Sequence, residues 1–140
     1  MYQKDYILRI IEQIGVLIRG IFGLIENGNL EQAREKLDDL YYEALKEDAA
    51  FFTLIPVDKL TQKLLTDHNY TNGHLEILAE LLNAEAELAF ATGNSSESLE
   101  YSRKSLTLLE FLDEVYKTYS QERLDKMDMI RKRIKVLSKR

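Results

Sequence analysis

His68 and His74 are the only histidines in the chain, and their spacing bears on metal binding. They stand six residues apart across an expected turn, with Asp67 and Asn69 beside the first. A zinc site needs three or four ligands in a defined geometry, and ligands on one helix usually lie three or four residues apart. No Cys is present to add a thiolate ligand. We therefore interpret both histidines as polar turn residues and expect no metal site.

Three glutamates fall near the apolar face of a helix expected over residues 74–92, where they could act in acid or base catalysis. They are Glu80, Glu85 and Glu87. No His, Cys or second placed group accompanies them, and acids on helices are usually solvated. The lack of Cys also excludes a cysteine nucleophile. We therefore expect no catalytic residue, no cofactor and no enzyme activity.

Gly15, Gly20 and Gly23 lie inside a helical pattern, so they do not form a phosphate-binding loop. We interpret them as positions of close packing between helices. The helix that contains them is apolar around almost its whole circumference and must be covered on several sides. Two arrangements would cover it. The helix could lie at the centre of the bundle, or part of it could form a homodimer interface.

Charge is unevenly distributed along the chain. Residues 126–140 hold seven Lys or Arg and one acid, a net charge of +6, whereas residues 1–125 have a net charge of −11. The candidate basic patch consists of Arg131, Lys132, Arg133 and Lys135. It could meet nucleic acid or an anionic surface, but it has no aromatic residue on which a base could stack. The simplest partner for the basic segment is the acidic body of the same chain.

The composition predicts a single all-α domain over residues 1–140. Hydrophobic residues make up 45% of the chain and charged residues 31%, a balance that supports one core. One Pro and six Gly are few helix breakers for this length. Arg9, Glu12 and Arg19 interrupt the most apolar stretch, so we expect neither a membrane span nor a signal peptide. Together with the lack of Cys, this favours the cytoplasm.

Apolar residues recur at three- and four-residue spacing in six segments, and each segment is expected to be a helix. These helices should cover residues 4–27, 30–47, 58–67, 74–92, 95–118 and 121–138. Pro56 marks the main break in the chain, because the residue before a proline avoids helical geometry. Asp58 and Ser120 are the expected N-caps of the third and sixth helices.

One pattern occurs twice in the chain at identical offsets. The first unit has Gly28, Asn29, Gln32 and Ala33, and the second has Gly93, Asn94, Glu97 and Ser98. Each Asn is followed three residues later by Gln or Glu, which is the spacing of a capping box. The units are 65 residues apart, close to twice the roughly 34-residue period of a repeat made of two helices. This favours stacked helical hairpins.

The repeated pattern resembles the tetratricopeptide repeat family, which has Gly and Asn at the inter-helix turn and small residues, here Gly20, Ala86 and Ala89, where helices approach closely. The resemblance covers about half of the chain. The usual aromatic residue and terminal Pro are missing from both units, and residues 49–78 leave open whether a third unit exists. The opening residues Gln3, Lys4, Asp5 and Tyr6, with Arg9 and Glu12, are also similar to a family of short bacterial helical-repeat proteins.

The tetratricopeptide resemblance implies antiparallel hairpins in a right-handed superhelix or a bundle of about six helices. It also implies a groove that binds a peptide or a helix of another protein. The positions that match the groove are Ile18, Phe22 and Ile25 on the first helix and Asn83, Glu87 and Phe90 on its counterpart. We therefore expect a non-catalytic adaptor or scaffold. The alternatives are a self-associating structural bundle and, less favoured, a binder of nucleic acid or an anionic surface.

Overall fold

The computed structural model describes residues 2–139, and the side chains of residues 8–139. Seven helices and no strand occur in this part of the chain, which confirms the predicted all-α class. The helices are α1 (Tyr2–Glu26), α2 (Leu30–Leu45), α3 (Ala49–Thr53), α4 (Leu60–Asp67), α5 (Asn72–Ala91), α6 (Ser95–Tyr116) and α7 (Gln121–Ser138). All six predicted helices are present, and their ends fall within two residues of the predicted ones.

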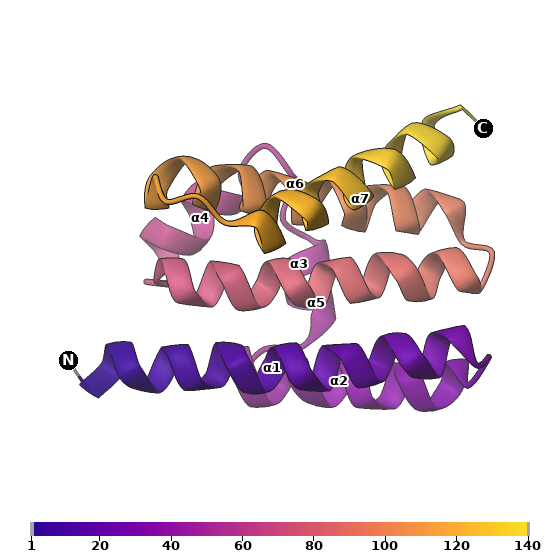
Figure 1. Cartoon of the computed structure of the whole chain (residues 1–140), viewed down its shortest axis with the longest axis horizontal. Helices are drawn as coiled ribbons and strands as arrows, with labels where there is room; N and C mark the ends of the chain where they lie inside the picture. Colours follow the sequence, from indigo (N-terminus) through magenta and orange to yellow (C-terminus); the bar gives the residue numbers. More distant parts are fainter. Residues whose placement is uncertain (1, 140) are drawn as a thin grey trace.

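Two antiparallel hairpins, α1–α2 and α5–α6, make up most of the molecule, and α7 packs on α6 (Figure 1). The hairpins join because α5 packs on both α1 and α2. In Figure 1, α1 and α5 lie side by side and run in the same direction. The short helices α3 and α4 belong to the connection between the two hairpins. The arrangement is a bundle of stacked hairpins.

The turns of the two hairpins have the same backbone geometry. Gly28 and Gly93 both have φ of +80°, the left-handed region in which glycine is favoured. Immediately after them, the N–H of Asn29 bonds to Leu24 and the N–H of Asn94 bonds to Ala89, each at 2.8 Å. These bonds close each helix with the same six-residue turn. The sequence pattern that occurs twice is therefore also a structural pattern that occurs twice.

The predicted capping boxes at Asn29 and Asn94 do not form. Neither Asn side chain caps its helix, and ψ at the two residues is 62° and 74°. At Thr71, by contrast, ψ is 171° and the side chain accepts the backbone N–H of His74. An N-cap in the extended region aims its side chain at the first turn. The preceding glycine turn holds each Asn outside that region, so its side chain cannot reach the helix.

The central helix is α5, and not α1 as one of the two predicted arrangements has it. Twelve residues of α5 are buried, distributed around its circumference. In α1, by contrast, Leu8, Val16 and Leu17 are each at least 50% exposed. α5 is enclosed because helices of both hairpins pack on it. The outer face of α1 has no such cover among the described residues.

Small side chains bring α5 and α6 close together. Ser98, Ser102 and Ser105 lie fully buried on one face of α6. The hydroxyl of Ser98 donates to the carbonyl of Ala86, and that of Ser105 donates to the carbonyl of Ala79, both at 2.8 Å. Bonds from side chains to the neighbouring helix's backbone need this close approach, and they satisfy buried hydroxyls that would otherwise destabilise the core.

The glycines of α1 do not mark close packing, contrary to the prediction. A Cβ atom placed on Gly20 or Gly23 would meet nothing within 4 Å. A Cβ atom on Gly15 would meet only the guanidinium of Arg19, at 3.8 Å. Open space therefore surrounds these positions of α1. A glycine inside a helix costs about 1 kcal/mol relative to alanine, and no intramolecular contact of the described residues accounts for Gly20 and Gly23.

The connection between the hairpins is held by a buried lysine. Lys104 of α6 is 1% exposed, and its ammonium donates to the carbonyls of Phe52, at 3.3 Å, and Thr53, at 2.8 Å. These carbonyls end α3, a helix that the sequence did not predict. The next helix, α4, begins at Leu60 behind Lys59, so the predicted N-cap at Asp58 is wrong. The predicted cap at Ser120 is confirmed, because its hydroxyl accepts the N–H of Arg123.

Candidate functional site

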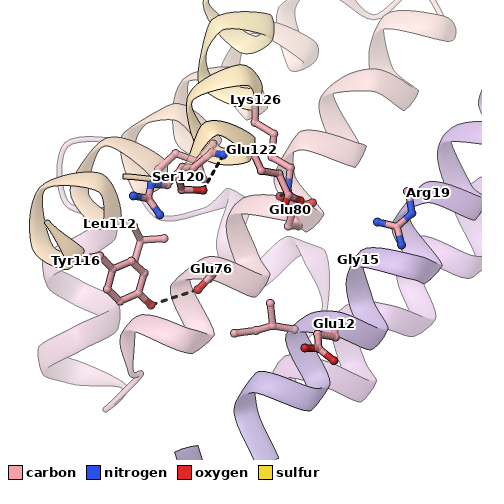
Figure 2. Close-up of a pocket in the computed structure, with 13 residues that line it drawn as sticks. Glu12, Gly15, Arg19, Glu76, Glu80, Leu112, Tyr116, Ser120, Glu122 and Lys126 are labelled. Atoms are coloured by element: carbon pink, nitrogen blue, oxygen red, sulfur yellow. Dashed lines mark hydrogen bonds and ion pairs between the residues drawn. The ribbon is translucent and has the colours of Figure 1, made fainter. Parts of the chain in front are cut away.

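A cleft of about 310 Å³ opens between α1, α5 and α7, with α6 beneath it (Figure 2). One wall is α1, and the other consists of α5 and the start of α7. Leu109 and Leu112 of α6 are buried and provide the apolar floor. Since α1 begins the first hairpin, α5 begins the second and α7 follows it, the walls come from three successive parts of the chain.

Two acids on the wall formed by α5 and α7 share one cation. The ammonium of Lys126 donates to the carboxylate of Glu80, and it lies 3.5 Å from the carboxylate of Glu122. The lysine and Glu80 are both partly buried, whereas Glu122 is exposed. The pair with Glu80 links α7 to α5 at the end of the cleft where Arg19 lies on the opposite wall. The ion pair of Lys126 and Glu80 thus holds α7 against α5.

Tyr116 and Glu76 form a second link at the cleft. The tyrosine hydroxyl donates to the Glu76 carboxylate at 3.2 Å. Burial, and then the negative charge of Glu76, raise the pKa of Tyr116 to about 12. The guanidinium of Arg123 lies 5.8 Å from the centre of the tyrosine ring and also pairs with Asp113 at 2.9 Å. The hydroxyl therefore stays protonated at physiological pH and donates a hydrogen bond that holds the Glu76 carboxylate.

The α1 wall is different, because its charged side chains have no partner among the described residues. Glu12 and Arg19 are exposed, and both line the cleft. Ile11, next to Glu12, and Gly15, between the two charged residues, are the uncharged residues of this wall. Figure 2 shows Glu12 and Arg19 rising from α1 opposite the paired charges of α5 and α7. A hydrated charge with no internal partner is free to pair with a ligand.

The six predicted groove residues do not line this cleft. Ile18 is a core residue at 1% exposure, and Phe22 and Ile25 pack partly buried against the core. Phe90 is 43% exposed, away from the cleft. Asn83 and Glu87 lie under Arg133 of α7. The residues that do line the α1 wall, Ile11, Glu12, Gly15 and Arg19, form a different stripe of the helix.

The predicted groove residues and the cleft residues lie on different stripes of α1, which is apolar on most of its surface. A periodic pattern identifies an inward face only when the other face is polar. One signal could have identified the cleft residues. Glu12 and Arg19 are charged residues seven positions apart in an otherwise apolar stretch, and residues seven apart lie on one face of a helix.

Two cations of the predicted basic patch are bound to the chain's own acidic body. The side chain of Arg133 is 8% exposed and donates to Ser102 at 2.8 Å, Asn83 at 2.6 Å and Glu87 at 2.5 Å. Burial lowers the pKa of Arg133, and Glu87 opposes that change. Arg131 lies 3.3 Å from Glu110, and both remain exposed.

This pairing confirms, for Arg131 and Arg133, the prediction that the basic segment meets the acidic body of the same chain. Lys132 and Lys135 remain exposed, with no hydrogen bond or ion pair among the described residues. The patch therefore presents less free positive charge than its sequence indicates. Its more buried arginine holds α7 to α5 and α6.

The three glutamates predicted as possible acids or bases all lie in ion pairs. Glu80 pairs with Lys126 and Glu87 with Arg133. Glu85 is the most buried, since its side chain is 3% exposed, and it accepts from the guanidinium of Arg34 at 2.8 Å. The hydrogen bond that Arg34 donates to Glu85 is also the main cause that raises the pKa of Arg34. Each glutamate thus connects α5 to another helix.

The two histidines lie at opposite sides of one turn, away from the cleft. The ring of His68 stands edge-on to Phe51, with ring centres 4.9 Å apart. His74 completes the capping box of α5, because its Nδ1 atom accepts the backbone N–H of Thr71 at 3.0 Å. Among the described residues, no group of three His, Cys, Asp or Glu is placed to hold a metal ion.

The chain was compared with family models, with curated proteins and with solved structures. None of the three comparisons gave a match. Function is therefore inferred from the chain's own residues and from the cleft that they form. Within residues 2–139, none of the helices combines the length and the apolar character that crossing a bilayer requires.

Proposed function

We propose that the chain is a non-catalytic protein-interaction module, an adaptor or scaffold, that holds a segment of another protein in the cleft between α1, α5 and α7. The observation that carries the proposal is the contrast between the two walls. On α5 and α7, Glu80 and Glu122 pair with Lys126 and Glu76 is held by Tyr116, whereas on α1 Glu12 and Arg19 face the cleft with no partner among the described residues. Rigid walls with a few free polar groups are typical of binding sites.

The dimensions of the cleft fit anchoring side chains of a partner. About 310 Å³ accommodates a few side chains at a time, and helices that extend beyond it on both sides can contact the rest of a bound segment. The apolar floor of Leu109 and Leu112 would take an apolar anchor. The tetratricopeptide resemblance also favours a partner in this place, because it implies binding between the first helices of successive hairpins.

The first test is to block the cleft without disturbing the fold. Gly15→Phe places an aromatic ring on the α1 wall, where a Cβ atom has room. Gly20→Phe is the matched control, since it makes the same change on the same helix at an exposed position outside the cleft. Random displayed peptides, long enough to form several helical turns, are selected on the unmodified protein and then offered to both variants.

We expect peptides selected on the unmodified protein to lose at least about tenfold in affinity for Gly15→Phe, because the ring occupies their site. They should keep their affinity for Gly20→Phe. Circular dichroism should show the same helix content in all three proteins. Peptides that bind all three equally, or a library that yields no binder at all, would show that this cleft is not a peptide-binding site.

Self-association is a second candidate function, and the outer face of α1 is the observation that favours it. Val16 and Leu17 are exposed there, and Gly20 adds a position open to close approach. Apolar side chains grouped on one helix are typical of protein contacts. A second copy of the chain could cover this face while the cleft stays open, because Val16 and Leu17 do not line the cleft.

A further inference from the structure

The charges on the α1 wall are of opposite sign and are separated by two helical turns. Glu12 and Arg19 stand seven residues apart, so they share one face of α1. At 1.5 Å per residue, their positions are about 10 Å apart along the helix axis. Neither makes a hydrogen bond or an ion pair within residues 8–139. The wall is therefore an exposed electrical dipole that nothing in the described chain neutralises.

The opposite wall reinforces one end of this dipole. Figure 2 places Glu76 of α5 at the same end of the cleft as Glu12, and the Glu76 carboxylate accepts only the neutral Tyr116 hydroxyl. Two carboxylates thus lie at that end, and none of the described residues pairs a cation with either. At the other end Arg19 stands opposite Glu80, whose charge is already matched by Lys126. At that end Glu80 and Glu122 share Lys126, and Arg19 has no ion-pair partner among the described residues. One end of the cleft thus has two acids without a paired cation among the described residues, and the other end has a cation without a paired acid among them.

Between the two ends, the cleft is apolar and open. Gly15 lies between Glu12 and Arg19 in the sequence, so the α1 wall has no side chain there, and the buried residue Leu112 forms part of the floor of the same cleft. A partner's apolar side chain that enters there would lie beside the Arg19 guanidinium, which is 3.8 Å from the place of a Cβ atom on Gly15. The three features together have the spacing of one face of a helix, with a charge, an apolar residue and an opposite charge over two turns.

We propose that the cleft recognises an amphipathic helix of a partner protein that carries a basic residue and an acidic residue about two turns apart, with an apolar residue between them. The basic residue lies between Glu12 and Glu76, the apolar residue over Gly15, and the acidic residue against Arg19. This inference rests on the proposed function and adds to it the chemistry and the direction of the bound segment. Direction is fixed because a helix inserted the other way places like charges together.

The test is a charge exchange within the α1 wall. The double variant Glu12→Arg with Arg19→Glu keeps the net charge and reverses the dipole. Its matched control is Lys36→Glu with Glu43→Arg on α2, which exchanges two exposed charges, also seven residues apart, outside the cleft. The displayed peptide library is selected separately on the unmodified protein and on both double variants, and the selected peptides are measured by fluorescence anisotropy.

On the unmodified protein, we expect the selected peptides to share one order of the basic, apolar and acidic residues over two turns. The cleft double variant should select the reverse order and should bind the original peptides about tenfold more weakly, since two attractive charge pairs become repulsive. The α2 double variant should select the same peptides as the unmodified protein. The tenfold difference should shrink at high salt.

The possible failures of the two proposals are distinguishable. If the cleft selects peptides that Gly15→Phe rejects but that show no charge pattern, the proposed function stands and the charge-based recognition is wrong. The same conclusion follows if the reversed dipole selects the original order. If no peptide is selected by any of the proteins, both proposals fall together.

Discussion

At the scale of single residues, Glu85 shows how a charge is kept inside the bundle. It is the only acidic residue that the described part of the chain buries, and Arg34 of α2 provides its counter-charge. Arg34 reaches this carboxylate from a partly exposed position and also contacts Asp38. Burying a carboxylate requires such a partner, because removal from water otherwise costs more than folding can offset.

Replacing Arg34 by methionine should lower the free energy of unfolding by roughly 3 kcal/mol, the lower end of the cost of breaking a buried pair. The lower end applies because Arg34 is partly open to water. Arg131→Met is the control, since Arg131 and Glu110 form an exposed pair, and such pairs contribute less than about 1 kcal/mol. Urea denaturation measures both. Equal losses in the two variants would mean that Glu85 does not depend on Arg34.

At the scale of elements, the start of α5 has a capping box with a histidine in place of the usual Glu or Gln. The neutral ring of His74 accepts the N–H of Thr71, and a protonated ring could not accept it. Burial lowers the pKa of His74 below its ordinary value of 6.5. The folded state therefore binds this proton less readily than the unfolded state does.

The stability that this cap contributes is present above the ordinary histidine pKa and is lost as the pH falls below it. His74→Gln should keep the capping box, because Gln is a usual residue at this position, and should remove this pH dependence. Thermal unfolding of both proteins, followed from neutral pH to about pH 5, measures the effect. The melting temperature of the unmodified protein should fall relative to the Gln variant as the pH decreases. A constant difference would exclude a role for His74 protonation.

The same element explains which caps could be predicted. Ser120 was identified from sequence because its residue type and position suffice when the backbone is extended, as it is there. Asn29 and Asn94 have the same favourable residue type, but the glycine turn before each one sets a backbone conformation that a residue count does not reveal. The helix α3 escaped prediction because five residues are too few to show a period.

At the scale of the whole molecule, helices and hairpins follow from the sequence, whereas the site does not. Periodic segments and the repeated Gly-Asn pair predict the six longer helices because they are local features. Which residues line the cleft depends on how α1 is oriented about its axis relative to α5. Contacts between residues far apart in the chain set that orientation. Lys126, for example, closes the cleft from α7 through Glu80 of α5, and no local pattern connects these two residues.

Self-association is a prediction at this scale. If the outer face of α1 is a contact between two copies, Leu17→Glu should shift the protein toward a monomer, because a charge at a half-exposed apolar position repels its copy across a symmetric interface. Light scattering over a range of concentrations gives the mass. Leu54→Glu is the control, since Leu54 is an exposed leucine on the connection between the hairpins. A monomeric mass for the unmodified protein at high concentration would exclude the dimer.

The lysine that holds the connection between the hairpins has a consequence for how this chain can vary. Lys104 contacts carbonyl groups of the backbone at Phe52 and Thr53, which every amino acid possesses. The bond thus depends on where the backbone passes and not on which side chain stands there. Substitution at the partly exposed Thr53 leaves it intact, whereas an inserted residue that displaces the end of α3 breaks it. In this part of the molecule, length is under tighter constraint than composition.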